Sequence, residues 1–156
     1  MDCEVLVITQ AMKDSDLRIF ECQALRRVVF QQEQGIAAEL DCDGEDFGKD
    51  TFHLLLFDCI DDIKTPVATV RGRPIEEPKG IKLERMCVLD QFRDAGLGSL
   101  LLHDFEVHAR EIGVANVWLH AQIRSVEFYR KHGYRSTGEL FLEAGINHYL
   151  MTKALS

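Results

Sequence analysis

Residues 81–106 read IKLERMCVLDQFRDAGLGSLLLHDFE, and the predicted fold depends on this stretch. Residues 81–89 alternate and are rich in β-formers, which predicts a strand. From Gly98 on, apolar side chains follow helical spacing, which predicts a helix. Between them, Gly96 and Gly98 let the backbone approach a ligand, and the free N–H groups of a helix start favour an anion, above all a phosphate. The stretch therefore predicts a strand–loop–helix cradle for a pyrophosphate.

Two other phosphate-binding motifs do not fit this loop. A P-loop closes with Gly-Lys-Ser/Thr, whereas this helix opens with Gly98, Ser99 and Leu100. A dinucleotide fingerprint needs a third small residue where Leu101 stands. Taken alone, the loop is also compatible with a structural glycine turn, or with an unrelated nucleotide- or phosphate-binding α/β domain.

The composition describes one globular domain, residues 1–156, with 46% hydrophobic and 28% charged residues. The net charge of −8, without a basic run, argues against nucleic acid or an anionic membrane as partner. Neither a signal peptide nor an apolar run of the ~20 residues of a membrane span is evident. We expect a cytoplasmic protein and allow for a homodimer.

The cysteines and histidines suggest neither disulfides nor a metal site. The five cysteines are odd in number and contain no Cys-x-x-Cys pair, which indicates reduced thiols in a cytosolic protein. The six histidines show no metal-ligand spacing, so no metal is expected.

The chain before residue 81 predicts a strand at residues 3–9 and then a helix that Asp14 and Ser15 can cap and Gly35 can end. The predicted apolar face of this helix is Leu17, Phe20, Ala24, Leu25 and Val28. Residues 39–50 hold six Asp or Glu in twelve positions, which predicts a solvated loop over a site. Strands at 51–60 and 67–73 form a hairpin about a turn at 61–66, and a second turn spans 74–80.

After residue 106, Gly113 ends the helix and residues 116–121 form the next strand. A short helix at 126–132 lies between a Ser125 cap and Gly133. Residues 134–140 and 148–153 are two closing strands. The order predicts an α/β fold with a mixed sheet of about seven strands and about four helices, with one βαβ crossover at the glycine loop.

Two motifs at a suitable distance resemble those of one enzyme family. Residues 93–98 match Gln/Arg-x-x-Gly-x-Gly/Ala, the acyl-CoA signature of the GNAT N-acetyltransferases, and residues 128–134 carry the family's Phe-Tyr-x-x-x-Gly-Tyr. Nearly the whole chain resembles this family, and more narrowly its ElaA/YjcF-like branch, through residues 27–35, 83–89, 119–122 and 143–151. Gln122 replaces the Asn of many members, as it does in that branch, and Asn147 replaces the branch's Pro.

The resemblance implies direct transfer of an acetyl group from the co-substrate acetyl-CoA to a primary amine. The N–H groups of the loop would hold the pyrophosphate, with the Arg93 side chain as the nearest fixed cation. The strand edge at 86–88 would pair with the pantetheine amides and polarise the thioester carbonyl. The residues expected to bind the cofactor are Met86, Cys87, Val88, Arg93, Asp94, Ala95, Gly96, Leu97, Gly98, Ser99, Gln122 and Phe128.

Two residues are expected to act in catalysis. Tyr129 would stabilise the leaving thiolate, and Glu84 would act as the base for the amine, directly or through water. An ion pair of Glu84 with Arg85, Lys82 or Arg27 is an equal alternative. Cys87 is interpreted as a buried thiol, because no motif places a histidine and an orienting partner beside it. The residues expected to bind the acceptor are Arg27, Arg85, His120 and His148.

The acceptor is the least determined part of the prediction. The mixed charge of these residues favours a small polar amine whose carboxylate or phosphate Arg27 or Arg85 would grip. The acidic residues 39–50 favour instead a cationic polyamine or a lysine-rich protein, so transfer to protein lysines or N-termini stays open. A catalytically idle domain that binds CoA as a sensor or interaction module stays open as well.

Overall fold

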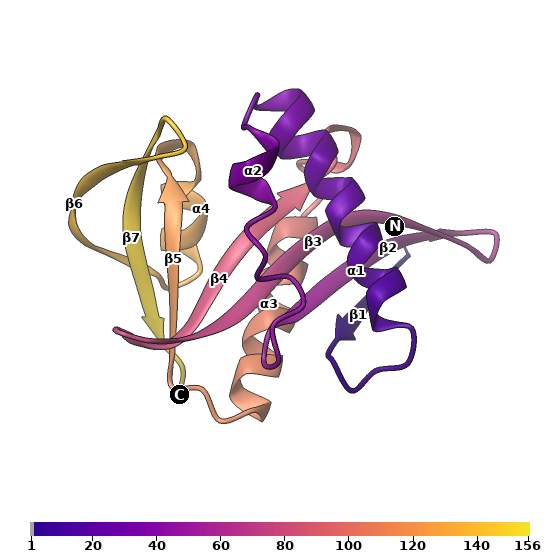
Figure 1. The fold of residues 1–156 in the computed structure, drawn as a ribbon, viewed down its shortest axis with the longest axis horizontal. Helices are drawn as coiled ribbons and strands as arrows, with labels where there is room; N and C mark the ends of the chain where they lie inside the picture. Colours follow the sequence, from indigo (N-terminus) through magenta and orange to yellow (C-terminus); the bar gives the residue numbers. More distant parts are fainter. Residues whose placement is uncertain (1) are drawn as a thin grey trace.

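The computed structural model describes residues 2–156, which form a seven-stranded sheet with helices on both faces (Figure 1). The strands are β1 (Cys3–Ile8), β2 (Phe52–Ile60), β3 (Ile63–Glu76), β4 (Lys79–Val88), β5 (Asn116–Gln122), β6 (Arg135–Glu143) and β7 (Ile146–Ala154). The α-helices are α1 (Ser15–Arg26), α2 (Ala38–Asp41), α3 (Leu97–Glu111) and α4 (Val126–Lys131). A π-helix (Arg27–Glu33) continues α1, and short 3₁₀ turns lie at Asp90–Phe92 and Ile123–Ser125. In this part of the chain, no helix combines the length and apolar character needed to cross a membrane.

The strand order across the sheet is β1-β2-β3-β4-β5-β7-β6. β1 to β4 pair antiparallel, β4 and β5 pair parallel, and β7 pairs antiparallel with both β5 and β6. The crossover through α3 connects the parallel pair, as βαβ units require. The predicted mixed α/β fold with seven strands and four α-helices is confirmed.

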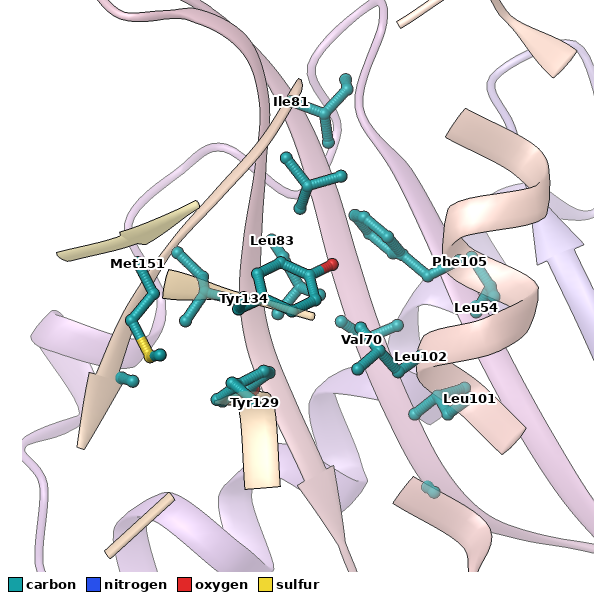
Figure 2. Packing of buried hydrophobic residues seen from close by; sticks show 14 of the residues in the cluster. Leu54, Val70, Ile81, Leu83, Leu101, Leu102, Phe105, Tyr129, Tyr134 and Met151 are labelled. Carbon is teal, nitrogen blue, oxygen red and sulfur yellow. The ribbon is translucent and has the colours of Figure 1, made fainter. Parts of the chain in front are cut away.

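Each face of the sheet has its own core. On the face of α3 and α4, Leu83 of β4 packs in one cluster with Leu101, Phe105 and Tyr129 (Figure 2). On the face of α1, the buried side chains of that helix form a second cluster with Leu55, Phe57 and Cys87 of the sheet. The site described below lies where β4 and β5 separate between these two layers.

The two turns of the early hairpins are tighter than predicted. β3 already begins at Ile63, because Asp61 and Asp62 alone make the turn, with φ of 50° and 65°. β3 also runs through Pro74, where a turn was predicted, and pairs Pro74 with Ile81. The pairing with β2 ends at Gly72, so Pro74 lies in a part of β3 that pairs with β4 alone, an edge position of the kind where proline occurs in sheets.

Helix α1 buries a face that shares only Leu25 with the predicted one. Leu17 and Phe20 have exposed fractions of 59% and 55%. Its buried residues are Ser15, Ile19, Cys22, Leu25 and Arg26. These residues also have helical spacing. Because one of them is the charged Arg26, a search for apolar residues alone does not find this face. The helix also changes to a π-helix at Arg27 instead of running regularly to Gly35.

The acidic segment 39–50 is not the solvated loop that its composition predicts. It contains the short helix α2, and its Asp41 and Asp46 are buried. Arg26 of α1 bonds both carboxylates, with Nε 3.0 Å from Asp41 Oδ1 and Nη1 2.7 Å from Asp46 Oδ1. Arg71 of β3, with an exposed fraction of 0%, bonds Asp46 Oδ1 at 2.9 Å. The segment is therefore fastened to α1 and the sheet by buried ion pairs.

Candidate active site

β4 and β5 pair only briefly before they separate. Their register joins Ile81 to Val117 and Leu83 to Leu119, and within residues 2–156 no pairing follows Leu83. In addition, a bulge centred on Arg85, with φ of 56°, lies opposite Val70 of β3. Beyond Leu83, the edge of β4 that faces β5 thus has N–H and C=O groups free for an extended ligand.

The separation opens a cleft of about 1040 Å³ that passes between the two strands. One end is lined by the glycine loop, Phe128 and Tyr129, and the other by Glu84, His120 and His148. Except for Ala95 and Arg27, every side chain and loop residue named in the sequence analysis as a site residue lines this cleft. Ala95 is exposed in the loop, and Arg27 is exposed on the π-helix.

The glycine loop has the geometry of an anion cradle. Asp94 and Gly96 have φ of 63° and 80°, and α3 begins at Leu97. The amide of Leu100 already bonds the Gly96 carbonyl, so the amides of residues 97–99 precede the helical ladder. A Cβ on Gly98 would lie 3.4 Å from the Phe128 ring, so the ring packs close to the loop. The loop therefore fits a pyrophosphate at a helix N-terminus.

Arg93, expected as the nearest fixed cation, is paired with a carboxylate in this structure. Its guanidinium makes two bonds to Glu33 of the π-helix, at 2.7 and 2.9 Å, and one from Nε to the Val88 carbonyl at 2.9 Å. Its charge is therefore already matched in this structure. Sequence reasoning missed a second cation at the cleft, Arg124, whose Nε bonds Gln122 at 3.0 Å. Gln122 in turn donates to Gln34 at 3.0 Å, so the end of the π-helix is bonded to β5 as well.

Tyr129 brings a protonated hydroxyl to the cleft. The side chain is 7% exposed, its ring packs edge-on against Phe128, and its hydroxyl lies 3.3 Å from Met86 Sδ. Burial raises the pKa of the phenol well above its ordinary value. Tyr129 is therefore available as a hydrogen-bond donor and not as a base.

Glu84 is held by arginines. Its Oε1 accepts from Arg73 Nε at 2.7 Å, and its Oε2 lies 3.1 Å from Arg71 Nη2. Burial acts to raise the pKa of this carboxyl, but the bond from Arg73 and the charge of Arg71 outweigh it and lower the pKa. Of the ion-pair partners considered from the sequence, Lys82 and Arg85 lie farther away, at 3.6 and 4.0 Å. A carboxylate with a lowered pKa is a weaker base, so this environment does not favour Glu84 for proton abstraction.

Cys87 lies on the far face of β4 from the core residue Leu83. Residues four apart share a face in a regular strand, but the bulge at Arg85 shifts the alternation, and Cys87 packs against α1. Burial raises the pKa of its thiol to about 12. The side chain of Cys87 is thus a buried thiol. The residue can contribute to the cleft through its backbone N–H and C=O groups.

At the end of the cleft opposite the glycine loop, His120 and His148 lie on neighbouring strands. A residue that the sequence analysis missed, Glu143 of β6, accepts from His120 Nδ1 at 3.0 Å and lies 3.8 Å from His148 Nε2. Arg85 is directed elsewhere, since it bonds the Leu40 carbonyl at 2.9 Å and Asp43 Oδ2 at 3.1 Å. Within residues 2–156, no group of three or more His, Cys, Asp and Glu side chains is placed to hold a metal ion.

Comparisons with known proteins agree with this geometry. Residues 61–155 match the acetyltransferase (GNAT) domain family. The chain is 38% identical over 130 residues to YjcF of Bacillus subtilis, described as an uncharacterised N-acetyltransferase, and the match covers 83% of this chain and 87% of YjcF.

Two solved structures share the architecture. An acyl-CoA N-acyltransferase from Pseudomonas aeruginosa is similar with a TM-score of 0.83 and 25% identity, over 98% of this chain and 100% of that chain. ElaA from Escherichia coli, at 24% identity, shares the fold with a TM-score of 0.82, over 97% of this chain and 99% of its own. Together with the strand opening and the glycine cradle, these matches show that the chain belongs to the GNAT family of acetyltransferases.

Proposed function

We propose that the protein transfers an acetyl group from acetyl-CoA to a primary amine of a small polar molecule by direct attack. The observation that carries this proposal is the opening between β4 and β5, which joins the glycine cradle at one end to a polar pocket at the other. The thiol of Cys87 is buried against α1 and its pKa is raised, which argues against an acetyl-cysteine intermediate and supports direct attack.

The residues of the cleft have distinct roles in this proposal. The amides of residues 97–99 hold the pyrophosphate, and the free edge of β4 at residues 86–88 pairs with the pantetheine amides. An N–H of that edge polarises the thioester carbonyl. Tyr129 donates a hydrogen bond to the departing thiolate. Because an ordinary phenol has a pKa of ~10 and a thiol of ~8.5, full proton transfer is uphill by roughly 2 kcal/mol even before burial acts.

Replacing Tyr129 by Phe is expected to lower turnover by roughly 10²-fold or less while acetyl-CoA affinity stays within a few-fold. The ring keeps its packing on Phe128, and only the hydroxyl is lost. Single-turnover kinetics separates the chemical step from product release. Tyr149→Phe is a matched control, because Tyr149 is partly buried on β7 and does not line the cleft. A Tyr129→Phe enzyme with wild-type single-turnover rates would reduce Tyr129 to a packing residue.

The charges at the acceptor end support a small amine over a cationic polymer. Asp41 and Asp46 are buried against Arg26, and Asp43 is paired with Arg71 and Arg85. The other three acidic residues of the segment, Glu39, Glu45 and Asp50, are exposed but do not line the cleft, so the segment offers little free negative charge to an acceptor inside the cleft. Lys82, by contrast, lies at 3.6 Å from its nearest carboxylate, with a side chain 20% exposed. We assign Lys82 the role of gripping a carboxylate or phosphate of the acceptor.

A screen of amino acids, amino sugars, polyamines and lysine peptides for acetyl-CoA-dependent thiol release tests the function. We expect amines that carry an acidic group to support the highest turnover. Thiol release with lysine peptides alone would contradict the small-molecule acceptor. Binding of acetyl-CoA without thiol release by any amine would favour an idle CoA-binding domain.

Replacing Lys82 by Ala is expected to raise the KM for an acidic amine by about 10-fold, the effect of losing one hydrogen bond to a charged group. Turnover at saturation should change little, because Lys82 is not part of the proposed chemistry. Steady-state kinetics with the best acceptor from the screen measures both quantities. Lys79→Ala, at the exposed start of the same strand, is the control. An unchanged KM in Lys82→Ala would remove Lys82 from the acceptor site.

A further inference from the structure

The proposed transfer needs a base for the acceptor ammonium, and Glu84 is poorly suited to that task because two arginines hold its carboxylate. The parallel pairing ends at Leu83 and Leu119, so Glu84 of β4 and His120 of β5 are the first residues after the paired part of the two strands. His120 therefore lies at the narrow end of the opening between the strands. A ligand that enters from the glycine cradle would bring its acyl end toward this point.

His120 is on the acceptor side of the sheet. Along β5, Val117, Leu119 and Ala121 are buried in the core under α3 and α4, so His120 and Gln122 face the opposite layer. Tyr129 belongs to the core under α3 and α4. The two side chains therefore flank the opening from opposite faces, one where an amine would arrive and the other where a thiolate would leave.

The contacts of His120 determine which ring nitrogen is free. Nδ1 lies 3.0 Å from Glu143 Oε1, and an ionised carboxylate can only accept, so Nδ1 carries the proton. The bond from His120 is the largest cause of the lowered pKa of Glu143, about 2, so this carboxyl is ionised at neutral pH. The ring also packs edge-on against Phe141, with centroids 4.8 Å apart. In the neutral form of this ring the lone pair is therefore on Nε2, which Glu143 does not bond.

His148 differs from His120 in this respect. Its Nδ1 lies 2.7 Å from the Ile146 carbonyl, which can only accept, so Nδ1 again carries the proton. Its Nε2, however, faces Glu143 Oε2 at 3.8 Å and not a free position. Glu143 from β6 contacts His120, and His148 from β7 and Lys82 and Glu84 from β4 line the same cleft.

We propose that His120 is the catalytic base of the transfer and that Glu143 is the positioning residue that fixes its tautomer. This assignment rests on the proposed function. Nε2 takes a proton from the acceptor ammonium, and the neutral amine then forms a bond to the thioester carbon. The C–S bond breaks, and the thiolate leaves beside the Tyr129 hydroxyl. The second nitrogen proton reprotonates the sulfur through Tyr129 or water, and the proton on His120 goes to solvent.

A pair of small amines tests the base role. Methylamine is almost fully protonated at pH 7 and needs a base, whereas hydroxylamine is already neutral. We expect His120→Gln to lower acetyl transfer to methylamine by about 10²-fold and transfer to hydroxylamine by only a few-fold. Glu143→Ala should show the same selectivity with a loss of about 10-fold. The controls are His103→Gln, at an exposed histidine of α3, and Glu139→Ala, at an exposed glutamate of β6.

The same pair of amines distinguishes the rival base. If Glu84→Gln, and not His120→Gln, loses methylamine transfer selectively, the base is Glu84 and the proposal is wrong. Equal losses with both amines in His120→Gln would reduce His120 to a structural residue and also overturn it.

Nitrogen-15 NMR of the histidine rings tests the pair without any acceptor. The ring signals of His120 are assigned as those that disappear in the His120→Gln spectrum. We expect them to show the Nδ1–H tautomer in the wild type and a mixture of tautomers in Glu143→Ala. An Nε2–H tautomer in the wild type would overturn the proposal, because no lone pair would face the cleft. If the wild type transfers acetyl to neither amine nor to any amine of the screen, the proposed function fails, and the NMR result still decides how His120 and Glu143 are arranged.

Discussion

A Gly98→Glu protein is expected to lose at least roughly 10²-fold in affinity for acetyl-CoA and CoA, since two or more charge-assisted hydrogen bonds are worth about 1.5–3 kcal/mol each. Gly98 lies in the first turn of α3, where the amides of residues 97–99 are free to bind an anion. A glutamate there brings its own negative charge to the positive end of the helix and fills the position of the pyrophosphate. The loop itself tolerates a side chain, because Gly98 does not have a positive φ.

Gly98→Ala separates bulk from charge. Its Cβ would lie 3.4 Å from the Phe128 ring, an ordinary contact, so its affinity should stay within a few-fold of the wild type. Gly96 is less suitable, because its φ of 80° strains any other residue. Calorimetry with acetyl-CoA, CoA and ATP measures the affinities, and the melting temperature confirms the fold. A folded Gly98→Glu protein with unchanged affinity would remove the loop from the binding site.

The parts of the structure that the sequence predicted are those that depend on local pattern. The strand at residues 81–89, the glycine turn and the start of α3 all follow from spacing within a few residues, and the structure has each of them close to the predicted bounds. The seven strands likewise follow from alternation and turn residues. The turns between the early strands differ from the predicted ones. The turn between β2 and β3 is shorter than predicted because the two adjacent aspartates Asp61 and Asp62 adopt a positive φ, which composition does not reveal.

The missed parts depend on pairs of charged residues far apart in the chain. Arg26 and Asp46 are separated by 20 residues, and His120 and Glu143 by 23, so no local pattern joins them. An arginine on an amphipathic helix is normally assigned to solvent, which is why the buried face of α1 was predicted wrongly. The sequence analysis also placed Arg27 in the acceptor site, whereas the structure exposes Arg27 on the π-helix. The pairing of Arg93 with Glu33, 60 residues away in the chain, was not predicted.

Replacing Asp46 by Asn is expected to lower the free energy of unfolding by about 3–5 kcal/mol, the cost of removing one partner from a buried ion pair. Its carboxylate accepts bonds from Arg26 at 2.7 Å, Arg71 at 2.9 Å and Gln23 at 2.8 Å. In the network, four arginines face four carboxylates, so the variant leaves one buried positive charge without a counter-charge. The residues are Arg26, Arg71, Arg73 and Arg85 with Asp41, Asp43, Asp46 and Glu84.

The Asp46→Asn variant should also change how stability depends on pH. Burial acts to raise the pKa of Asp46, but the bond and charge of Arg26 outweigh it and lower the pKa far below 3.8. The Asp46 carboxylate therefore stabilises the fold fully above its pKa in the unfolded chain. This stabilisation is lost as the pH falls toward its lower pKa in the folded protein, so the free energy of unfolding of the wild type should decline from about pH 4 to pH 2. Urea unfolding across this range should give a flatter curve for Asp46→Asn than for the wild type or for Asp50→Asn, at an exposed aspartate of the same segment. Equal urea midpoints for Asp46→Asn and wild type at pH 7 would mean that the buried network does not stabilise the fold.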